Sequence, residues 1–281
     1  STTNVTIQTG GTTGDGLGNG DITVSAPITW SANRLTLSAH RNIAVNANLD
    51  GSGGGNLSLL YGQGSTDGTI SGTAASYVIN APVTLPSGLT FVTQLGTTGT
   101  VKNYTVINEL GSAADATTTP ATMTLQGLAS LGLDATSSAQ TFGGFYALGS
   151  NIDASATSGW NQGRGFLPIA GNYIAETSDV TSAFVGQLEG LGNSINSLSI
   201  NPQEDVGAWR NFNVGLFGRL GSGGTVSNLK LDTCGCQRWR PRRACARRNN
   251  DRRLLVLRDG GQSIPIRLQP LLRWQCRWPR R

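Results

Sequence analysis

The four cysteines are the residues whose chemistry is easiest to test from sequence. They are Cys234, Cys236, Cys245 and Cys276. Cysteine thiolates bind zinc, usually as pairs separated by two or more residues and completed by further cysteines or histidines. Here the first pair is separated by a single residue, and the only histidine, His40, lies far away in the sequence. We therefore predict no metal site and no cofactor, and we interpret His40 as an ordinary turn or surface residue.

The segment that holds these cysteines is also strongly basic. Residues 234–281 contain fourteen arginines and two aspartates, a net charge of +12, together with Trp239, Trp274 and Trp278. Arginine and tryptophan in this density can bind nucleic acid through phosphates and base stacking. However, glycine and alanine codons of GC-rich DNA become arginine, tryptophan, cysteine and proline codons when they are read one nucleotide out of phase. We hypothesise that 234–281 is a frameshifted translation or a disordered end, with no nucleic-acid partner unless it is a genuine translation. The nucleotide sequence from codon 228 onward, translated in all three frames, tests this.

The carboxylates of the remaining chain raise the possibility of an enzyme. A polysaccharide lyase or hydrolase needs clustered carboxylates, or carboxylates that hold Ca²⁺ beside an arginine. The acidic residues considered are Asp15, Asp21, Asp50, Asp67, Asp134, Asp153, Asp179, Glu204 and Asp205. They are scattered, so we predict no catalytic residues. A β-helical carbohydrate-active enzyme stays the alternative, because stacked strands can bring distant residues into one groove. For Trp30, Trp160 and Trp209 we favour packing in corners or the core over stacking on sugars.

Composition predicts short strands and turns for residues 1–233. Glycine accounts for 39 of the 281 residues, and charged residues for 13%. Residues 1–233 contain five Arg, two Lys and fourteen acids, so their net charge is 5 + 2 − 14 = −7. A chain rich in Gly, Thr, Ser and Asn is a poor helix former. No run of about 18 apolar residues exists, so no transmembrane helix is predicted. The chain starts at Ser1 without a recognisable signal peptide, which suggests a fragment or a mature form.

Apolar residues alternate in short pairs that recur along the chain. The pairs are Ile22/Val24, Ile28/Trp30, Leu35/Leu37, Ile43/Val45 and Leu57/Leu59. Ile22 and Ile43 are 21 residues apart, and Leu35 and Leu57 are 22 apart. Short strands that return at this interval, about three per cycle, are typical of a β-solenoid whose cycles stack in parallel. Further strands are predicted at 77–79, 83–85, 89–92, 101–107 and 123–125, a protruding loop at 110–120 and a helical turn at 126–135.

One pattern occurs twice later in the chain. FVGQLEGLGNSINSLSI occupies 184–200 and GLFGRLGSGGTVSNLKL occupies 215–231. Aligned without gaps, Ile195 falls on Val226, Ile200 on Leu231 and Gly192 on Gly223. A unit this small cannot bury its own apolar face, so we expect it to stack on a neighbour.

These segments, together with GFYALGSNIDASATSGWNQGRGFLPIA at 144–170 and GNGDITVSAPITWSANRLTLSAHRNIAVNANL at 18–49, resemble the filamentous-haemagglutinin-like adhesins of Gram-negative bacteria. The repeated pattern resembles their GLUG-type repeats, and the resemblance covers about residues 15–233. It implies a right-handed parallel β-helix, export through an outer-membrane secretion partner, and attachment to surfaces. The NPNL-type secretion motif of the family is not matched, and no catalytic residues come with the resemblance.

The expected protein is therefore all-β, a right-handed parallel β-helix with a non-solenoid Arg-rich tail. We expect β-solenoid cycles in 1–140, a GLUG-type region that continues the solenoid in 141–233, and the tail in 234–281. The expected function is that of a fragment of a large secreted or cell-surface adhesin, a structural rod without enzymatic activity. Its expected partners are host or surface glycans or receptors, and the candidate contact surfaces are the loop at 110–120 and the insert at 201–213.

Overall fold

The protein is described by a computed structural model. It describes residues 3–10, 19–116, 118, 121–131, 141–170, 183–201 and 215–232. The chain divides into two compact units, Ser1–Pro241 and Arg242–Arg281, and all described residues belong to the first. The predictions for the tail, its cysteines and its tryptophans fall on 234–281, outside the described residues, and so does most of the insert at 201–213.

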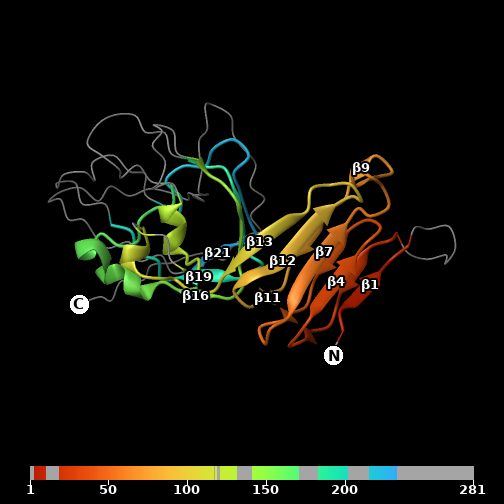
Figure 1. The fold of residues 1–281 in the computed structure, drawn as a ribbon, viewed down its shortest axis with the longest axis horizontal. Helices are drawn as coiled ribbons and strands as arrows, with labels where there is room; N and C mark the ends of the chain where they lie inside the picture. Colours follow the sequence, from red (N-terminus) through yellow and green to blue (C-terminus); the bar gives the residue numbers. More distant parts are fainter. Residues whose placement is uncertain are drawn as a thin grey trace, which may run out of the picture. The chain divides into compact units, whose positions relative to one another are not determined.

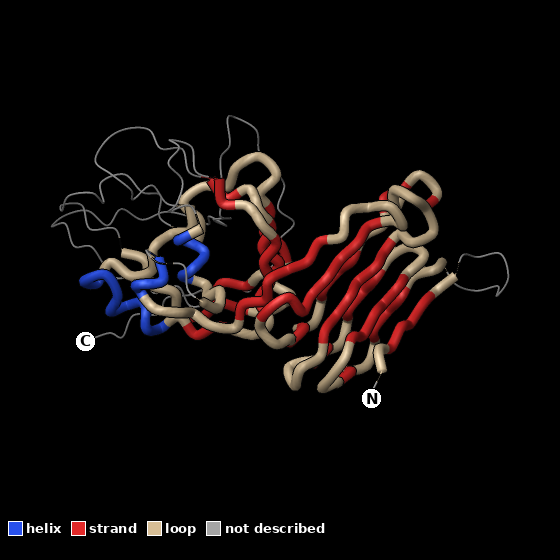
Figure 2. The backbone as a smooth tube through the Cα atoms, in the orientation of Figure 1, coloured by secondary structure: helices blue, strands red, loops and turns tan. Residues whose placement is uncertain are grey.

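The first unit is an all-β structure with mostly parallel sheets and a few short 3₁₀ helices (Figures 1 and 2). The main sheet has eight strands in the order β1 (Val5–Gln8), β4 (Arg34–Ser38), β7 (Asn56–Tyr61), β12 (Gly88–Leu95), β13 (Lys102–Ile107), β15 (Phe145–Leu148), β18 (Gln187–Glu189) and β20 (Thr225–Ser227). Three smaller parallel sheets comprise β2 (Ile22–Val24), β5 (Ile43–Val45) and β10 (Tyr77–Ile79); β3 (Ile28–Thr29), β6 (Leu49–Asp50) and β11 (Val83–Thr84); and β16 (Ile152–Asp153), β19 (Ser194–Asn196) and β21 (Lys230–Asp232).

The remaining elements are shorter. Strands β14 (Thr141–Phe142) and β17 (Ala183–Phe184) form a parallel pair, and β8 (Thr69–Ile70) and β9 (Thr73–Ala74) an antiparallel pair. The 3₁₀ helices are η1 (Ala113–Ala116), η2 (Gln126–Ser130) and η3 (Ser155–Gly163).

The amino-terminal part repeats one cycle of three strands. The cycles are β2–β3–β4, β5–β6–β7 and β10–β11–β12, and each strand pairs in parallel with its counterpart in the next cycle. Ile22 pairs with Ile43 and Leu35 with Leu57, which confirms the predicted 21- and 22-residue intervals. The third cycle comes back only after 34 residues, since Leu57 pairs with Phe91. The extra residues form the loop that contains β8 and β9.

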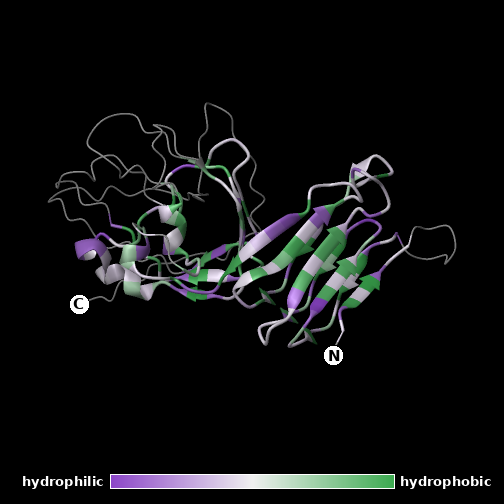
Figure 3. Cartoon of the chain, in the orientation of Figure 1, coloured by the Kyte–Doolittle hydropathy of each residue, from purple (hydrophilic) through white to green (hydrophobic). Residues whose placement is uncertain are grey.

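Alternation along these strands builds the first core. Leu35, Leu57 and Phe91 lie in register on adjacent strands and are at most 6% exposed. Figure 3 shows hydrophobic and hydrophilic residues alternating along the same strands. Fully burying one such side chain is worth about 1.5–3 kcal/mol, so this ladder accounts for much of the cohesion between cycles.

The direction of the main sheet reverses once, between β12 and β13, which pair antiparallel. Strands β15, β18 and β20 then pair in parallel onto β13. The uninterrupted parallel stack predicted from sequence therefore needs correction at this hairpin. A two-residue period places neighbouring side chains on opposite faces, and on β13 Val106 belongs to the first core and Ile107 to a second one. The second core thus lies on the opposite face of the main sheet.

The pattern that occurs twice in the sequence contributes to the second core. Phe184 contacts Phe217, with 4.9 Å between ring centroids. Leu188 pairs with Val226, and Ile195 with Leu231. The gapless alignment, which placed Ile195 on Val226, is therefore wrong. That alignment shifts the chain by 31 residues and so sets β19 against β20, whereas Leu188 and Val226 are 38 residues apart and Ile195 and Leu231 are 36 apart. The two intervals differ because the turn between β18 and β19 (190–193) is two residues longer than the turn between β20 and β21 (228–229).

Two further predictions of local structure are corrected, and one is confirmed in part. Residues 123–125 form no strand and lead into η2, which confirms helical structure for 126–130 of the predicted turn. Residues 110–120 do not simply protrude, because Ala116 is fully buried against Ala129 and Leu167. Residues 117, 119, 120 and 132–135 lie outside the described residues.

Polar side chains hold successive cycles together at the corners. The Asp21 carboxylate accepts the backbone N–H of Asn42 at 2.9 Å, and the Asn42 side chain accepts the backbone N–H of Ser76 at 2.9 Å. Asn151 accepts the backbone N–H of Ser194 at 2.8 Å. Each bond satisfies a backbone N–H group that is not paired with a neighbouring strand. The corner Asn and Asp side chains therefore stabilise the stacking of successive cycles.

Candidate ligand-binding pocket

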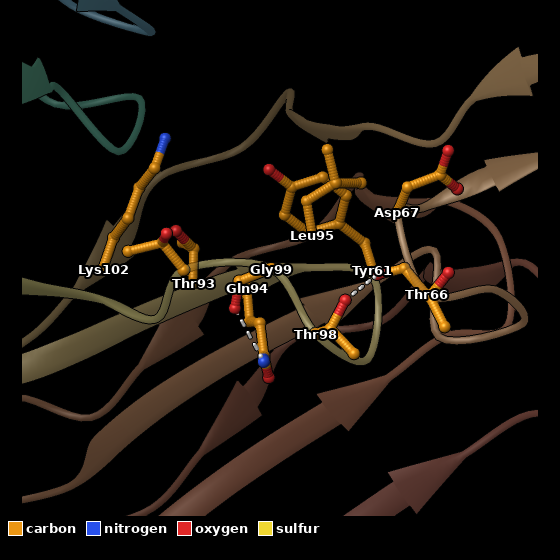
Figure 4. A pocket seen from close by; sticks show the side chains of 10 residues that line it. Tyr61, Thr66, Asp67, Thr93, Gln94, Leu95, Thr98, Gly99 and Lys102 are labelled. Atoms are coloured by element: carbon orange, nitrogen blue, oxygen red, sulfur yellow. Dashed lines mark hydrogen bonds between the residues drawn. The ribbon is translucent and has the colours of Figure 1, made fainter.

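A pocket of about 450 Å³ lies at the hairpin where the main sheet reverses. It is lined by the end of β7 and the loop after it, the end of β12, the β12–β13 turn and the start of β13. The lining residues are Tyr61, Thr66, Asp67, Thr93, Gln94, Leu95, Thr98, Gly99, Thr100 and Lys102. Figure 4 shows Lys102 to one side of the Tyr61 ring and Asp67 to the other.

Sheet register explains why polar groups converge here. Leu59 of β7 pairs with Thr93 of β12, and Thr93 pairs with Lys102 of β13. Paired residues point to the same face of a sheet, so Thr93 and Lys102 continue the row that Leu59 occupies in the first core. The first hydrophobic core therefore ends at the row that contains Thr93 and Lys102, and the pocket lies there.

Two side-chain hydrogen bonds tie down the rim of the pocket. The Thr98 hydroxyl donates to the Thr66 carbonyl at 2.9 Å, and the Gln94 amide donates to the Gly99 carbonyl at 3.0 Å (Figure 4). These bonds join the loop after β7 to the β12–β13 turn and close the turn on itself. The walls of the pocket are thus formed in advance of any ligand.

Asp67 and Lys102 supply the two charges. The Asp67 Oδ1 atom accepts the Thr69 backbone N–H at 2.9 Å and the Ser65 hydroxyl at 3.1 Å. These bonds, the backbone one foremost, lower the pKa of Asp67, so its carboxylate is ionised at neutral pH. The Lys102 Nζ atom donates to Gln187 Oε1 at 3.1 Å and lies 5.7 Å from the centroid of the Phe145 ring.

A buried polar network adjoins the pocket. Tyr61 packs edge-on against Tyr77, with 5.2 Å between ring centroids. The Tyr77 hydroxyl donates to Glu189 Oε2 at 2.9 Å, and the Ser227 hydroxyl donates to the same oxygen at 2.7 Å. Glu189 is 1% exposed, and burial raises its pKa. Burial, followed by the charge of Glu189, raises the pKa of Tyr77 well above its ordinary value. The network joins β10 of the first core to β18 and β20.

The acidic residues singled out from sequence do not converge where the structure describes them, at Asp21, Asp50, Asp67 and Asp153. Asp21 forms a two-pronged ion pair with Arg41, with 2.8 Å between Asp21 Oδ2 and Arg41 Nη2. Asp50 and Asp153, like Asp67, each accept the backbone N–H two residues on, as turn-forming aspartates do. Within the ranges that the structure describes, no group of three or more His, Cys, Asp or Glu residues is placed to hold a metal ion. Asp15, Asp134, Asp179, Glu204 and Asp205 lie outside the described residues.

The other candidates serve as corner residues. His40 lies so close to Gly20 and Gly64 that a Cβ atom at either glycine would overlap it, which confirms its assignment to a turn. Trp30 packs in the same way over Gly55 and against the first core, as predicted, and Trp160 packs against the second core. Trp209 lies outside the described residues.

Sequence reasoning missed Tyr61 and Lys102 as site residues and treated Asp67 only as one scattered acid. A usable signal was present, because residues 1–233 contain only two lysines, Lys102 and Lys230. A lysine on the inward row of an apolar strand indicates that the row leaves the core.

Comparisons with known proteins identify one similar segment. Over 87 residues, 31% of this chain, the sequence is 40% identical to halomucin of Haloquadratum walsbyi. The matched stretch is 1% of the length of halomucin, so the chain corresponds to a very small part of that protein. No family model matches the sequence, and no solved structure matches it. Among the described residues, no helix is both long and apolar enough to cross a membrane.

Proposed function

We propose that this chain is a parallel β-helical segment of a long secreted or cell-surface adhesin, which attaches to surface glycans or receptors and has no enzymatic activity of its own. The observation that carries the proposal is the stacking of strands in register from β1 to β20 across one sheet. Such stacking satisfies the hydrogen-bonding groups of the backbone between cycles, and it permits the structure to be extended by further cycles. An extended scaffold of this kind suits a protein that presents binding surfaces at a distance from the cell.

Two further observations support the proposal. The chain resembles filamentous-haemagglutinin-like adhesins in its repeated segments, and 87 of its residues are similar to a small part of one very long protein, halomucin. In this proposal the parent protein is exported and reaches the outside of the cell with the help of an outer-membrane secretion partner.

Bead adhesion under flow tests the function. The full chain is coupled to fluorescent beads, which are passed over cultured epithelial cells and over polysaccharide-coated glass. Beads that carry the heat-denatured chain at equal density are the control. The native chain is expected to retain several times more beads than the control on at least one surface. Equal retention on all surfaces would overturn the proposed function.

A further inference from the structure

We propose that the pocket at the β12–β13 hairpin binds an acidic sugar unit, a pyranose ring that carries a carboxylate. This inference rests on the proposed adhesive function, because it assigns a ligand class to one contact surface of the adhesin. The pocket volume of about 450 Å³ lies within the range of roughly 300–1,000 Å³ that small-molecule sites occupy.

Lys102 selects the carboxylate. An ammonium group has three donors, and the contact with Gln187 Oε1 uses one of them. Gln187 Oε1 also accepts the Tyr104 hydroxyl at 3.2 Å, so the group that positions Lys102 is itself held in place. A carboxylate placed at the remaining donors gains a charge-assisted hydrogen bond to a cation that is already oriented.

Asp67 fixes the opposite end of the ligand. The turn holds its Oδ1 atom through the Thr69 N–H and the Ser65 hydroxyl, and its Oδ2 atom is the acceptor that we assign to the ligand. An ionised carboxylate is an acceptor for the hydroxyl groups of a sugar and repels a second carboxylate. With Lys102 and Asp67 on opposite sides of Tyr61 (Figure 4), the acidic substituent is directed to Lys102 and the ring hydroxyls to Asp67.

Tyr61 provides the surface between the two charges. Its ring is half-buried and braced against Tyr77, and its hydroxyl makes no hydrogen bond to the described residues. A tyrosine offers a flat apolar face with a polar tip, which matches a sugar ring with C–H groups on its face and hydroxyls at its rim. Thr66, Thr98 and Thr100 add hydroxyls around it.

The test compares two probes that differ only at one carbon. Methyl glucuronide carries a carboxylate where methyl glucoside carries a hydroxymethyl group. Both are titrated into the full chain and followed by saturation-transfer NMR. We expect the glucuronide to bind at least about tenfold more tightly, the difference that one charge-assisted hydrogen bond supports. The variant K102M is expected to remove this preference, and the matched variant K230M to keep it, because Lys230 is exposed on β21 away from the pocket lining.

A second pair of variants tests the other end of the pocket. D67N keeps a turn-forming side chain and loses the charge, and it is expected to weaken binding of both sugars severalfold. D50N makes the same exchange in an equivalent turn outside the pocket and is expected to change nothing. Circular dichroism verifies that each variant is folded.

Three results would overturn the assignment of the pocket: equal binding of the two sugars, no binding of either, or a preference that survives in K102M. The bead assay separates this failure from failure of the adhesive function. If the beads adhere and neither sugar binds, the adhesive function is supported and the assignment of the pocket is wrong. If sugar binding depends on Lys102 and the beads do not adhere, the assignment of the pocket is supported and the adhesive function is wrong.

Discussion

Replacing Asn193 with alanine should destabilise the protein more than any other single change at the corners. Asn193 is 2% exposed, and its amide donates to the Val83 carbonyl at 2.9 Å and to the Leu148 carbonyl at 2.8 Å. Val83 belongs to β11 of the first core and Leu148 to β15 of the second. One side chain therefore joins strands from both halves of the structure.

The expected cost follows from what the alanine leaves behind. Two carbonyl oxygens lose a buried donor, and each unsatisfied buried group costs about 1–3 kcal/mol. The variant N193A should therefore lose about 2–6 kcal/mol of unfolding free energy, a large part of the roughly 5–15 kcal/mol available to a domain. Urea denaturation followed by circular dichroism measures the loss.

N151A is the matched control. Asn151 is exposed and accepts the backbone N–H and the hydroxyl of Ser194, so water can replace it. Its loss should cost about 0.5–1 kcal/mol. Hydrogen exchange adds a local readout, because the Val83 N–H that donates to the Leu191 carbonyl should exchange faster in N193A. If N193A shifts the urea midpoint no further than N151A does, the assigned role of Asn193 is wrong.

Three further predictions concern the cores and the corners. F91A removes a fully buried ring and should cost about 3–5 kcal/mol; a loss below about 1 kcal/mol in urea denaturation would contradict the packing. Because burial raises the pKa of Glu189 above its ordinary value of 4.5, its contribution to stability should be fully present below that pH and be lost as pH rises through the raised pKa. The thermal midpoint between pH 4 and 8 measures this, and E189Q should flatten the dependence; an unchanged slope would refute it. G55A places a Cβ atom on the Trp30 indole and should cost about 1–3 kcal/mol, whereas G10A, with open space around it, should be nearly neutral; equal thermal midpoints would argue against the tight corner.

The sequence predicted the first half of the fold better than the second. The pairing of Ile22 with Ile43 and of Leu35 with Leu57 could be predicted because the turns of the first two cycles are almost equally long. The return to Phe91 was hidden by an inserted loop, and the gapless alignment of the repeated pattern matched β19 with β20 instead of with β21. Periodicity reports spacing along the chain, so it fails wherever a corner gains or loses residues.

The pocket could not be predicted from composition. Its charges come from Asp67 in a loop and Lys102 at the start of a strand, which are 35 residues apart in the sequence and line one pocket only because β7 pairs with β12 and β12 with β13. The same reversal could not be read from alternation, because parallel and antiparallel strands share a two-residue period.

The reversal at β12 and β13 also bears on the sense in which the chain can wind on either side of it. Past this hairpin the main-sheet strands run in the opposite direction, and the core that they enclose lies on the opposite face. Each change alone would invert the sense in which the chain winds around its core, whereas both together restore it. Crossovers between parallel strands strongly favour one hand. The two halves can therefore share a single sheet and still wind with the same hand, and the antiparallel step needs no left-handed turn.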